Sequence, residues 1–165
     1  MKTLVSSGTK EVMIRTDGPV TMIGEKINPT GRKKLAQALR EMNLDYVRDL
    51  ARKQAAAGAD LLDVNVGVPG LDDVALLPEV AKVVAAEVDL PLCIDTASPE
   101  ALAAALPVVP GKPLVNSVNG EEASLASVLP LVKDRGAAVI GLAMDENGIP
   151  EDPETRAAIA EKIVE

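Results

Sequence analysis

Polar side chains stand at the ends of several short apolar runs in this chain: Glu25, Asp63, Asn65, Asp95 and Asn116. Buried carboxylates and amides are costly unless they are paired, so a repeated placement of this kind indicates a ligand site. An ionised Asp accepts hydrogen bonds from ring N–H and amino groups, whereas Asn both donates and accepts. This chemistry suits the edge of a flat heterocycle such as a pterin, and a purine or pyrimidine would fit nearly as well.

The residue types that are absent from the sequence exclude several kinds of catalytic and metal site. The sequence has no histidine, which excludes imidazole bases, Ser-His-Asp triads and histidine-ligated metals. We therefore expect no metal bound by this chain. It also has no Trp or Phe and a single Tyr. The core must be built from Ala, Val, Leu and Ile, which suits layers of small branched side chains on a parallel sheet.

Composition and charge set the broad class of the protein. The hydrophobic share of 47% and charged share of 25% are those of a globular chain. The net charge of −8 argues against a nucleic-acid partner, because phosphate binding needs clustered Lys and Arg. The only basic cluster, residues 32–34, is best interpreted as a solvated loop.

Targeting signals and cysteine usage lead us to expect a cytoplasmic protein without a membrane segment. No apolar run approaches the about 20 residues of a membrane span, and the first residues lack the apolar stretch of a secretory signal. Cys93 is alone within the apolar run 90–94. We expect it to be a buried structural thiol.

Short apolar runs alternate with amphipathic stretches along the chain, which is the pattern of repeated βα units. The helices have recognisable starts at Asn43, at Ser98-Pro99 and at Asp152-Pro153. Parallel strands present all their carboxyl ends on one face, so the polar residues should converge there. The predicted strands cover residues 21–25, 60–65, 92–95, 113–116 and 138–144.

Two architectures fit strands joined by helices, namely a barrel and a doubly wound sheet. A doubly wound nucleotide-binding sheet carries a Gly-rich phosphate turn after its first strand. Here residues 26–31 read Lys-Ile-Asn-Pro-Thr-Gly, with neither a GxGxxG nor a Walker sequence. We therefore favour an α/β fold of the (β/α)8 TIM-barrel type for residues 21–165.

Residues 1–20 are expected to form a separate N-terminal hairpin or leader. The segments 11–15 and 20–22 flank Asp17-Gly18, which favours a turn between two strands. The hairpin would plug the N-terminal mouth of the barrel, or the segment would be a loose leader.

Five motifs together carry a family resemblance, in order along the chain: Gly24-Glu25-Lys26-Ile27-Asn28, Leu62-Asp63-Val64-Asn65-Val66-Gly67, Leu92-Cys93-Ile94-Asp95-Thr96, Val115-Asn116-Ser117, and Ile140-Gly141-Leu142-Ala143-Met144 followed by Gly148-Ile149-Pro150. As a set they resemble the pterin-binding methyltransferases. That family includes the methyltetrahydrofolate:corrinoid/iron–sulfur protein methyltransferase and the folate module of cobalamin-dependent methionine synthase. The resemblance runs from about Met22 to the last residue and implies a dihydropteroate synthase-like barrel.

Dihydropteroate synthase belongs to the same superfamily and shares the pair Asp95-Thr96 and Asn116. The chain departs from the synthase in its first strand, where Gly-Glu-Lys-Ile-Asn replaces an Asn-x-Thr-Pro-Asp-Ser-Phe loop. It also lacks the Gly-Gly-Glu-Ser run after Asp63. Methyl transfer is thus preferred, and condensation of a pterin with aminobenzoate stays as an alternative.

The resemblance implies a role for each candidate site residue. Asp95 and Asn116 would hydrogen-bond the pterin ring. Four others would line or brace the pocket, namely Asn65, Asp63, Glu25 and Asn28. Met144 and Asn119 would touch the folate or the approaching corrinoid. The reaction would move a methyl group between N5 of tetrahydrofolate and the cobalt of a corrinoid (cobalamin) carried by a partner protein.

A (β/α)8 barrel typically needs about 250 residues, whereas this sequence predicts five βα units in 165 residues. The family's Asn that reaches N5, the expected catalytic contact, has no position in this sequence. We expect a truncated chain, a fragment completed by another polypeptide, or a self-complementing oligomer such as a homodimer. A non-catalytic folate-binding chain completed by a partner is therefore the second functional hypothesis.

Overall fold

The computed structural model describes residues 2–165, in which two β-sheets are present. The first is an antiparallel hairpin of β1 (Lys2–Ser6) and β2 (Glu11–Arg15). The second is parallel, and its strand order follows the chain: β3 (Ile23–Ile27), β4 (Leu61–Val64), β5 (Leu92–Asp95), β6 (Leu114–Asn119) and β7 (Ala138–Leu142). The fold is α/β and forms part of a TIM barrel, as predicted.

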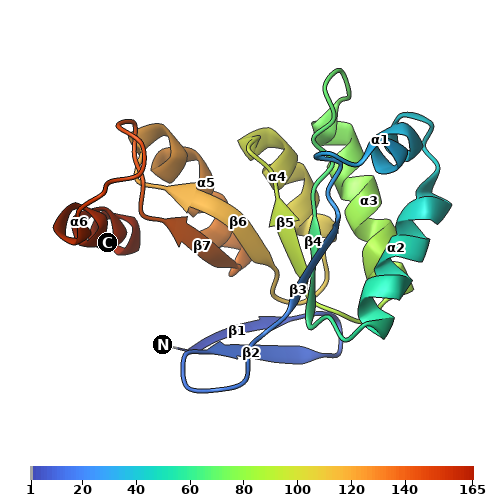
Figure 1. Cartoon of the computed structure of the whole chain (residues 1–165), viewed down its shortest axis with the longest axis horizontal. Coiled ribbons are helices and arrows are strands. Elements are labelled where there is room, and N and C mark those ends of the chain that lie inside the picture. The colour runs from blue at the N-terminus through green and yellow to red at the C-terminus, as the bar shows by residue number, and fades with distance from the viewer. Residues whose placement is uncertain (1) are drawn as a thin grey trace.

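Helices fill the connections between the parallel strands and follow one another around the outside of the sheet (Figure 1). They are α1 (Lys33–Arg40), α2 (Leu44–Ala56), α3 (Asp73–Glu87), α4 (Pro99–Ala105) with the short 3-10 helix η1 (Leu106–Val108), α5 (Glu122–Arg135) and α6 (Pro153–Val164). The predicted starts at Asn43, Ser98 and Asp152 are confirmed. Each of these side chains accepts a hydrogen bond from the backbone N–H three residues further on, which satisfies one of the free donors of a helix end.

Side chains alternate between the two faces of the parallel sheet, as the geometry of a strand requires. Leu62, Val64 and Ile94 point toward the helices and belong to the larger apolar core. Leu61 and Cys93 point the other way and belong to a second, smaller cluster. The sheet therefore has one face covered by helices and one inner face, which in a closed barrel would be the interior.

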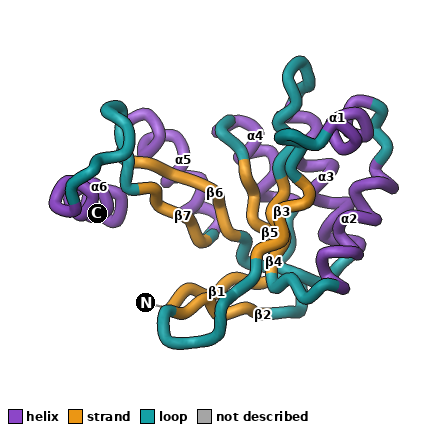
Figure 2. The backbone as a smooth tube through the Cα atoms, in the orientation of Figure 1, coloured by secondary structure: helices purple, strands orange, loops and turns teal. Residues whose placement is uncertain are grey.

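The hairpin covers the amino-terminal end of this inner face (Figure 2). Val5 of β1 is fully buried in a cluster with the first inward residues of four strands: Leu61, Cys93, Leu114 and Ala138. The backbone of Ser6 exchanges two hydrogen bonds with that of Lys112, at 2.8 and 3.0 Å. The hairpin is thus packed against the strand ends rather than extended away from them.

The predicted pairing of this hairpin was wrong. Residues 11–15 pair with Lys2–Ser6 in the register Val5↔Val12, so the chain reverses at residues 7–10. Residues 20–22 form no strand with them. Pro19 has no N–H to donate to a ladder, whereas residues 2–6 offer an uninterrupted set of donors and place Val5 on the core.

The two outer strands of the parallel sheet, β3 and β7, have no further strand beside them within residues 2–165. A side chain also satisfies a backbone donor of β3: the Oε1 of buried Gln54 accepts a hydrogen bond from the Lys26 N–H at 2.7 Å, where the β3–β4 register shifts. In this same range of residues, no helix has the length and apolar character needed to cross a membrane.

Candidate functional site

The predicted polar residues share the inner face of the sheet, at the carboxyl-terminal end. Asp95 on β5 lies directly opposite Asn116 on β6 in the parallel register. Asp63 on β4 lies opposite Cys93, one inward position below Asp95. Asn65 follows β4 and reaches Asp95. The structure therefore brings four of the predicted residues together on adjacent strands.

A hydrogen bond fixes the amide of Asn65 against the carboxylate of Asp95. Asn65 Nδ2 donates to Asp95 Oδ2 at 2.9 Å, and the Gly67 N–H donates to Asn65 Oδ1 at 2.8 Å. Both ends of the amide are thus engaged, which holds its orientation. The other carboxylate oxygen of Asp95, Oδ1, accepts no hydrogen bond from any group in the described range, so it is available to a ligand donor.

Asp63 is the buried acid of the site, with 2% of its surface exposed. Burial is the largest cause that raises the pKa of this carboxyl to about 6, and the negative charges of Asp95 and Glu25 add to it. Hydrogen bonds with the side chains of Cys93 and Asn116 act in the opposite direction. Asp63 therefore contacts Asn116, which is expected to hold the ligand, but is itself buried away from the ligand.

Cys93 is confirmed as a buried free thiol. Burial and the adjacent Asp63 carboxylate raise the pKa of the thiol far above its ordinary value. The neutral thiol is a poor nucleophile. Its role is to fill the inner face and to donate toward Asp63.

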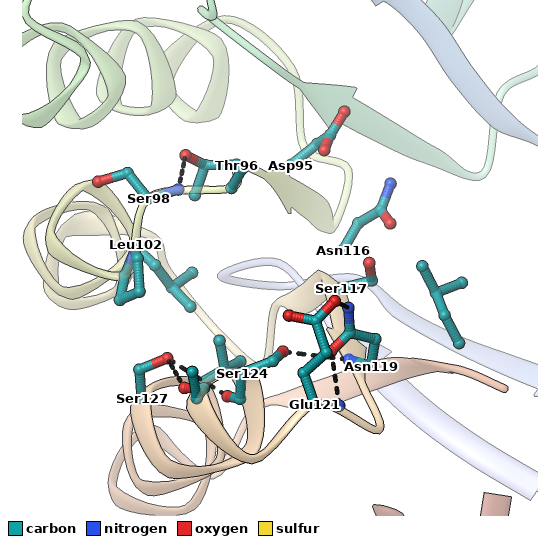
Figure 3. Close-up of a pocket in the computed structure, with 15 residues that line it drawn as sticks. Asp95, Thr96, Ser98, Leu102, Asn116, Ser117, Asn119, Glu121, Ser124 and Ser127 are labelled. Atoms are coloured by element: carbon teal, nitrogen blue, oxygen red, sulfur yellow. Dashed lines mark hydrogen bonds between the residues drawn. The ribbon is translucent and has the colours of Figure 1, made fainter. Parts of the chain in front are cut away.

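A cavity of about 480 Å³ opens between β5 with α4 and β6 with α5 (Figure 3). Asp95 and Asn116 line it, and their side chains point to the same side of the strands in the figure. Asn119 also lines it, held by Glu121, whose backbone N–H donates to Asn119 Oδ1 and whose Oε1 accepts from Asn119 Nδ2, both at 3.1 Å. The remaining polar lining consists of hydroxyls: Thr96, Ser98, Ser117, Ser124 and Ser127.

These hydroxyls were missed by the sequence analysis. Thr96 and Ser117 follow Asp95 and Asn116 immediately, so their adjacency to two predicted site residues was the available signal. Ser124 lies in the first turn of α5, and its Oγ accepts a hydrogen bond from the Asn119 N–H at 3.2 Å. Only the fold shows that this turn faces the strand ends.

A second cavity of about 410 Å³ joins Asn65 and Asp95 to Thr30, in the loop after β3. Asn28 lines neither this cavity nor the first. The Oδ1 of Asn28 accepts a hydrogen bond from the Thr30 N–H at 3.0 Å. Asn28 therefore braces the loop from which Thr30 lines the second cavity. Glu25 is exposed, and its negative charge acts on the Asp63 carboxyl.

Met144, like Asn28, lines neither of the two cavities. Its backbone carbonyl accepts a hydrogen bond from the Gly120 N–H at 2.8 Å. It therefore links the loop after β7 to the loop after β6. Within residues 2–165, no three His, Cys, Asp or Glu side chains are grouped as metal ligands.

The chain forms part of a parallel barrel and has amide and carboxylate groups at the carboxyl ends of its strands. These features define a class of ligand-binding barrels. Comparison with known proteins identifies the family within that class. Residues 24–165 match the family model described as "Pterin binding enzyme". The chain belongs to the pterin-binding enzyme family.

Two curated relatives show which branch of the family is similar in sequence. The chain is 33% identical over 165 residues to a methionine synthase of Mycobacterium tuberculosis, with 97% of the chain and 14% of that protein covered. It is 34% identical over 149 residues to the methylcorrinoid:tetrahydrofolate methyltransferase of Eubacterium limosum, with 87% of the chain and 54% of that protein covered. The chain thus spans about half, or less, of the length of these relatives.

Solved structures agree on the fold. A dihydropteroate synthase of Xanthomonas albilineans superposes with a TM-score of 0.66 at 22% identity, over 99% of this chain and 59% of that one. The 7,8-dihydropteroate synthase of Vibrio fischeri gives a TM-score of 0.67 at 17% identity, over 98% and 61%. These likenesses confirm the predicted dihydropteroate synthase-like fold.

Proposed function

We propose that this chain forms the pterin-binding part of a methyltransferase that moves a methyl group between N5 of tetrahydrofolate and the cobalt of a corrinoid. The observation that carries the proposal is the meeting of Asp63, Asn65, Asp95 and Asn116 at the carboxyl ends of adjacent strands. The names of the curated relatives, a methionine synthase and a methylcorrinoid:tetrahydrofolate methyltransferase, support it at the family level.

The geometry suits the edge of a pterin. Asp95 Oδ1 would accept from a ring N–H or the amino group, because Asn65 already occupies Oδ2. The Asn116 amide, next to Asp95 in the register, would complete the pattern with one donor and one acceptor. Hydrogen bonds to a charged acceptor are the stronger kind, worth about 1.5–3 kcal/mol each. Asp95 therefore carries the largest share of the expected pterin affinity.

In the proposed reaction the folate-bound methyl carbon is attacked by the electron pair of a reduced corrinoid cobalt. The cobalt–carbon bond forms, the electron pair of the carbon–N5 bond passes to N5, and N5 takes up a proton. An amine is a poor leaving group, so hydrogen bonding or proton transfer at N5 must accompany the step. Correct orientation of the two reactants supplies much of the remaining acceleration.

The corrinoid would be carried by a partner protein or domain, which approaches the carboxyl end of the strands. We propose a cytoplasmic location as part of the same function. The group that contacts N5 is not assigned among residues 1–165, so the catalytic residue is left open. Met144, Asn28 and Glu25 are proposed to border the folate or the corrinoid rather than to grip the pterin.

A second candidate, a non-catalytic folate-binding chain completed by a partner, is favoured by one observation. The parallel sheet has outer strands without neighbours within residues 2–165, and unpaired strand edges are a ready surface for pairing with another chain. Condensation of a pterin with aminobenzoate is less favoured. The dihydropteroate synthases are similar in fold at 17–22% identity, whereas the relatives at 33–34% identity are named for methyl transfer.

Calorimetric titration of the 165-residue chain with tetrahydropterin and tetrahydrofolate tests the pterin site. Asp95→Asn should weaken binding of both about 10- to 100-fold, since it removes the charge from the acceptor. Asp134→Asn, the same change at an exposed position of α5, should leave affinity unchanged. Equal affinities for Asp95→Asn and the unmodified chain would contradict the proposed pterin contact.

The methyl-transfer step is tested separately, by mixing the chain with methyltetrahydrofolate and reduced cobalamin and following the cobalamin spectrum. Turnover would support the methyltransferase and exclude the non-catalytic alternative. Pterin binding without turnover would favour that alternative. Absence of any pterin binding would overturn both.

A further inference from the structure

Asp63 is a buried carboxyl without a cation beside it. It has 2% of its surface exposed, it lines neither of the two cavities, and no ion pair among residues 2–165 includes it. The titratable groups that act on it are Glu25 of β3 and both Cys93 and Asp95 of β5, and none of these is a cation. Asp63 can therefore affect a bound ligand only through the side chains that it touches.

The two side chains that hydrogen-bond with Asp63 differ in what they can donate and accept. The Cys93 thiol is a weak donor and a weak acceptor, whereas Asn116 has a donor, Nδ2, and an acceptor, Oδ1. An ionised carboxylate only accepts, so Asn116 must turn Nδ2 toward it. A protonated carboxyl has an O–H to donate, and Asn116 Oδ1 is the stronger acceptor available to it. The protonation state of Asp63 thus determines which end of the amide turns toward β4 and which end is left for the cavity.

The direction of the Asn116 amide matters because Asp95 is its neighbour in the cavity (Figure 3). Asp95 offers a ligand the acceptor Oδ1. When Asn116 Oδ1 also faces the cavity, the two residues present two acceptors side by side, which match two neighbouring donors. A pterin carries such a pair in its amino group and the adjacent ring N–H. When Asn116 Nδ2 faces the cavity instead, this match is lost.

We propose that Asp63 is a positioning residue whose ionisation turns the Asn116 amide, so that the cavity presents two acceptors when Asp63 is ionised and one acceptor with one donor when it is protonated. This inference rests on the proposed pterin site, and Asp63 itself does not touch the ligand. Burial, followed by the charges of Asp95 and Glu25, raises the pKa of Asp63 to about 6. The ionised form, which suits a pterin, therefore predominates at pH 7.5 and gives way to the protonated form at lower pH.

The first test is calorimetric titration of the 165-residue chain with tetrahydropterin at pH 5.0, 6.0 and 7.5. At pH 5.0 about one molecule in ten has an ionised Asp63, so the affinity should be about 10-fold lower than at pH 7.5. Asp63→Asn does not ionise and should lack this drop. The ratio of the affinity of the variant to that of the unmodified chain cancels the titration of the ligand itself. This ratio should rise about 10-fold from pH 7.5 to pH 5.0.

The matched control is Asp134→Asn, which makes the same change at an exposed position of α5. Its affinity should fall with pH as that of the unmodified chain does, so its ratio should stay constant. A constant ratio for Asp63→Asn across the three pH values would overturn the inference and leave the pterin site standing. If tetrahydropterin fails to bind the unmodified chain at every pH, the proposed function fails, and this inference fails with it.

The turn of the amide can also be followed by NMR in the unmodified chain, without a ligand. The side-chain NH2 signals of Asn116, assigned by their loss in Asn116→Ala, should shift with the same pH midpoint as the carboxyl carbon of Asp63. This measurement does not depend on the folding of a variant at position 63. Asn116 signals that stay in place while the Asp63 carboxyl titrates would overturn the inference, as would an Asp63 carboxyl that does not titrate between pH 5.0 and 7.5.

Discussion

Replacing Asp63 with asparagine should stabilise the chain at neutral pH. The Asp63 carboxyl has its pKa raised from its ordinary 3.8 to about 6, first by burial and then by the charges of Asp95 and Glu25. The folded chain therefore binds this proton more tightly than the unfolded chain does. By linkage, the stabilisation from this proton is present below pH 3.8 and is lost as the pH rises through about 6.

The size of the effect follows from the pKa difference. About two pKa units correspond to about 3 kcal/mol between the protonated and ionised limits. Asparagine has nearly the same shape and does not ionise, so Asp63→Asn should be more stable than the unmodified chain by about 3 kcal/mol at pH 7.5. At pH 4.5 the native carboxyl is protonated, and the advantage should shrink to about 1 kcal/mol.

Urea denaturation at pH 4.5, 6.0 and 7.5 measures this difference. Circular dichroism is the suitable signal, because the chain has no Trp and a single Tyr. Asp134→Asn, at an exposed carboxyl of α5, controls for the loss of a negative charge. A stability difference between Asp63→Asn and the unmodified chain that stays constant from pH 4.5 to 7.5 would refute the reasoning.

Three further predictions concern packing and local structure. Gly111→Ala should destabilise the chain by more than about 3 kcal/mol in urea denaturation. The φ of Gly111 is +70°, and an added Cβ would lie 2.1 Å from the Ser7 carbonyl oxygen. An unchanged midpoint of the urea transition would contradict this prediction. Ser98→Ala should cost about 1 kcal/mol by the same assay, since Ser98 Oγ accepts the Ala101 N–H at 3.1 Å, and Ser98→Asn should restore it. Cys93 should resist alkylation by iodoacetamide at pH 8 until the chain is unfolded, because burial and the Asp63 carboxylate hold the pKa of its thiol high. Mass spectrometry measures the labelling. Rapid labelling of the folded chain would contradict this prediction.

Local patterns were enough to predict most of the parallel sheet. The strand at 92–95 forms as predicted, because its apolar run ends at a polar residue and a capped helix follows at Ser98. The first strand begins two residues later than predicted, at Ile23. Its register is interrupted between Gly24 and Ile27, where Gln54 from α2 takes over a backbone hydrogen bond. A backbone hydrogen bond that is made by a distant side chain cannot be predicted from the local sequence pattern.

The hairpin shows the same limit more clearly. Asp17-Gly18 is a good turn sequence, yet the chain reverses earlier, at residues 7–10. The decisive contacts are distant: Val5 packs on four strands, and the Asp89 carboxylate accepts hydrogen bonds from the Ser7 and Thr9 hydroxyls. Turn preference is a weak bias compared with burial of a side chain in the core.

The candidate site was predictable wherever it depends on strand ends. Asp95 and Asn116 both close apolar runs, and parallel pairing alone makes them neighbours. The cavity lined by Lys26 and by Arg32, Lys33 and Lys34 was not predictable, because it exists only where α1 packs beside α2. Arg32 and Lys33 are adjacent in any conformation, but Tyr46 reaches the same cavity from another helix.

Along the strand direction, the inner face of the sheet has one layer that is expected to determine stability and another that is expected to determine ligand binding. Its amino-terminal layer is apolar and closed by Val5, so substitutions there should lower the free energy of unfolding and leave ligand affinity nearly unchanged. Its carboxyl-terminal layer, with Asp95 and Asn116, is polar and open to the cavity, so changes there should act mainly on binding. Asp63 lies between the layers, buried yet in contact with Asn116. Its substitution is the one expected to change both quantities, raising stability while loosening the amide that faces the ligand.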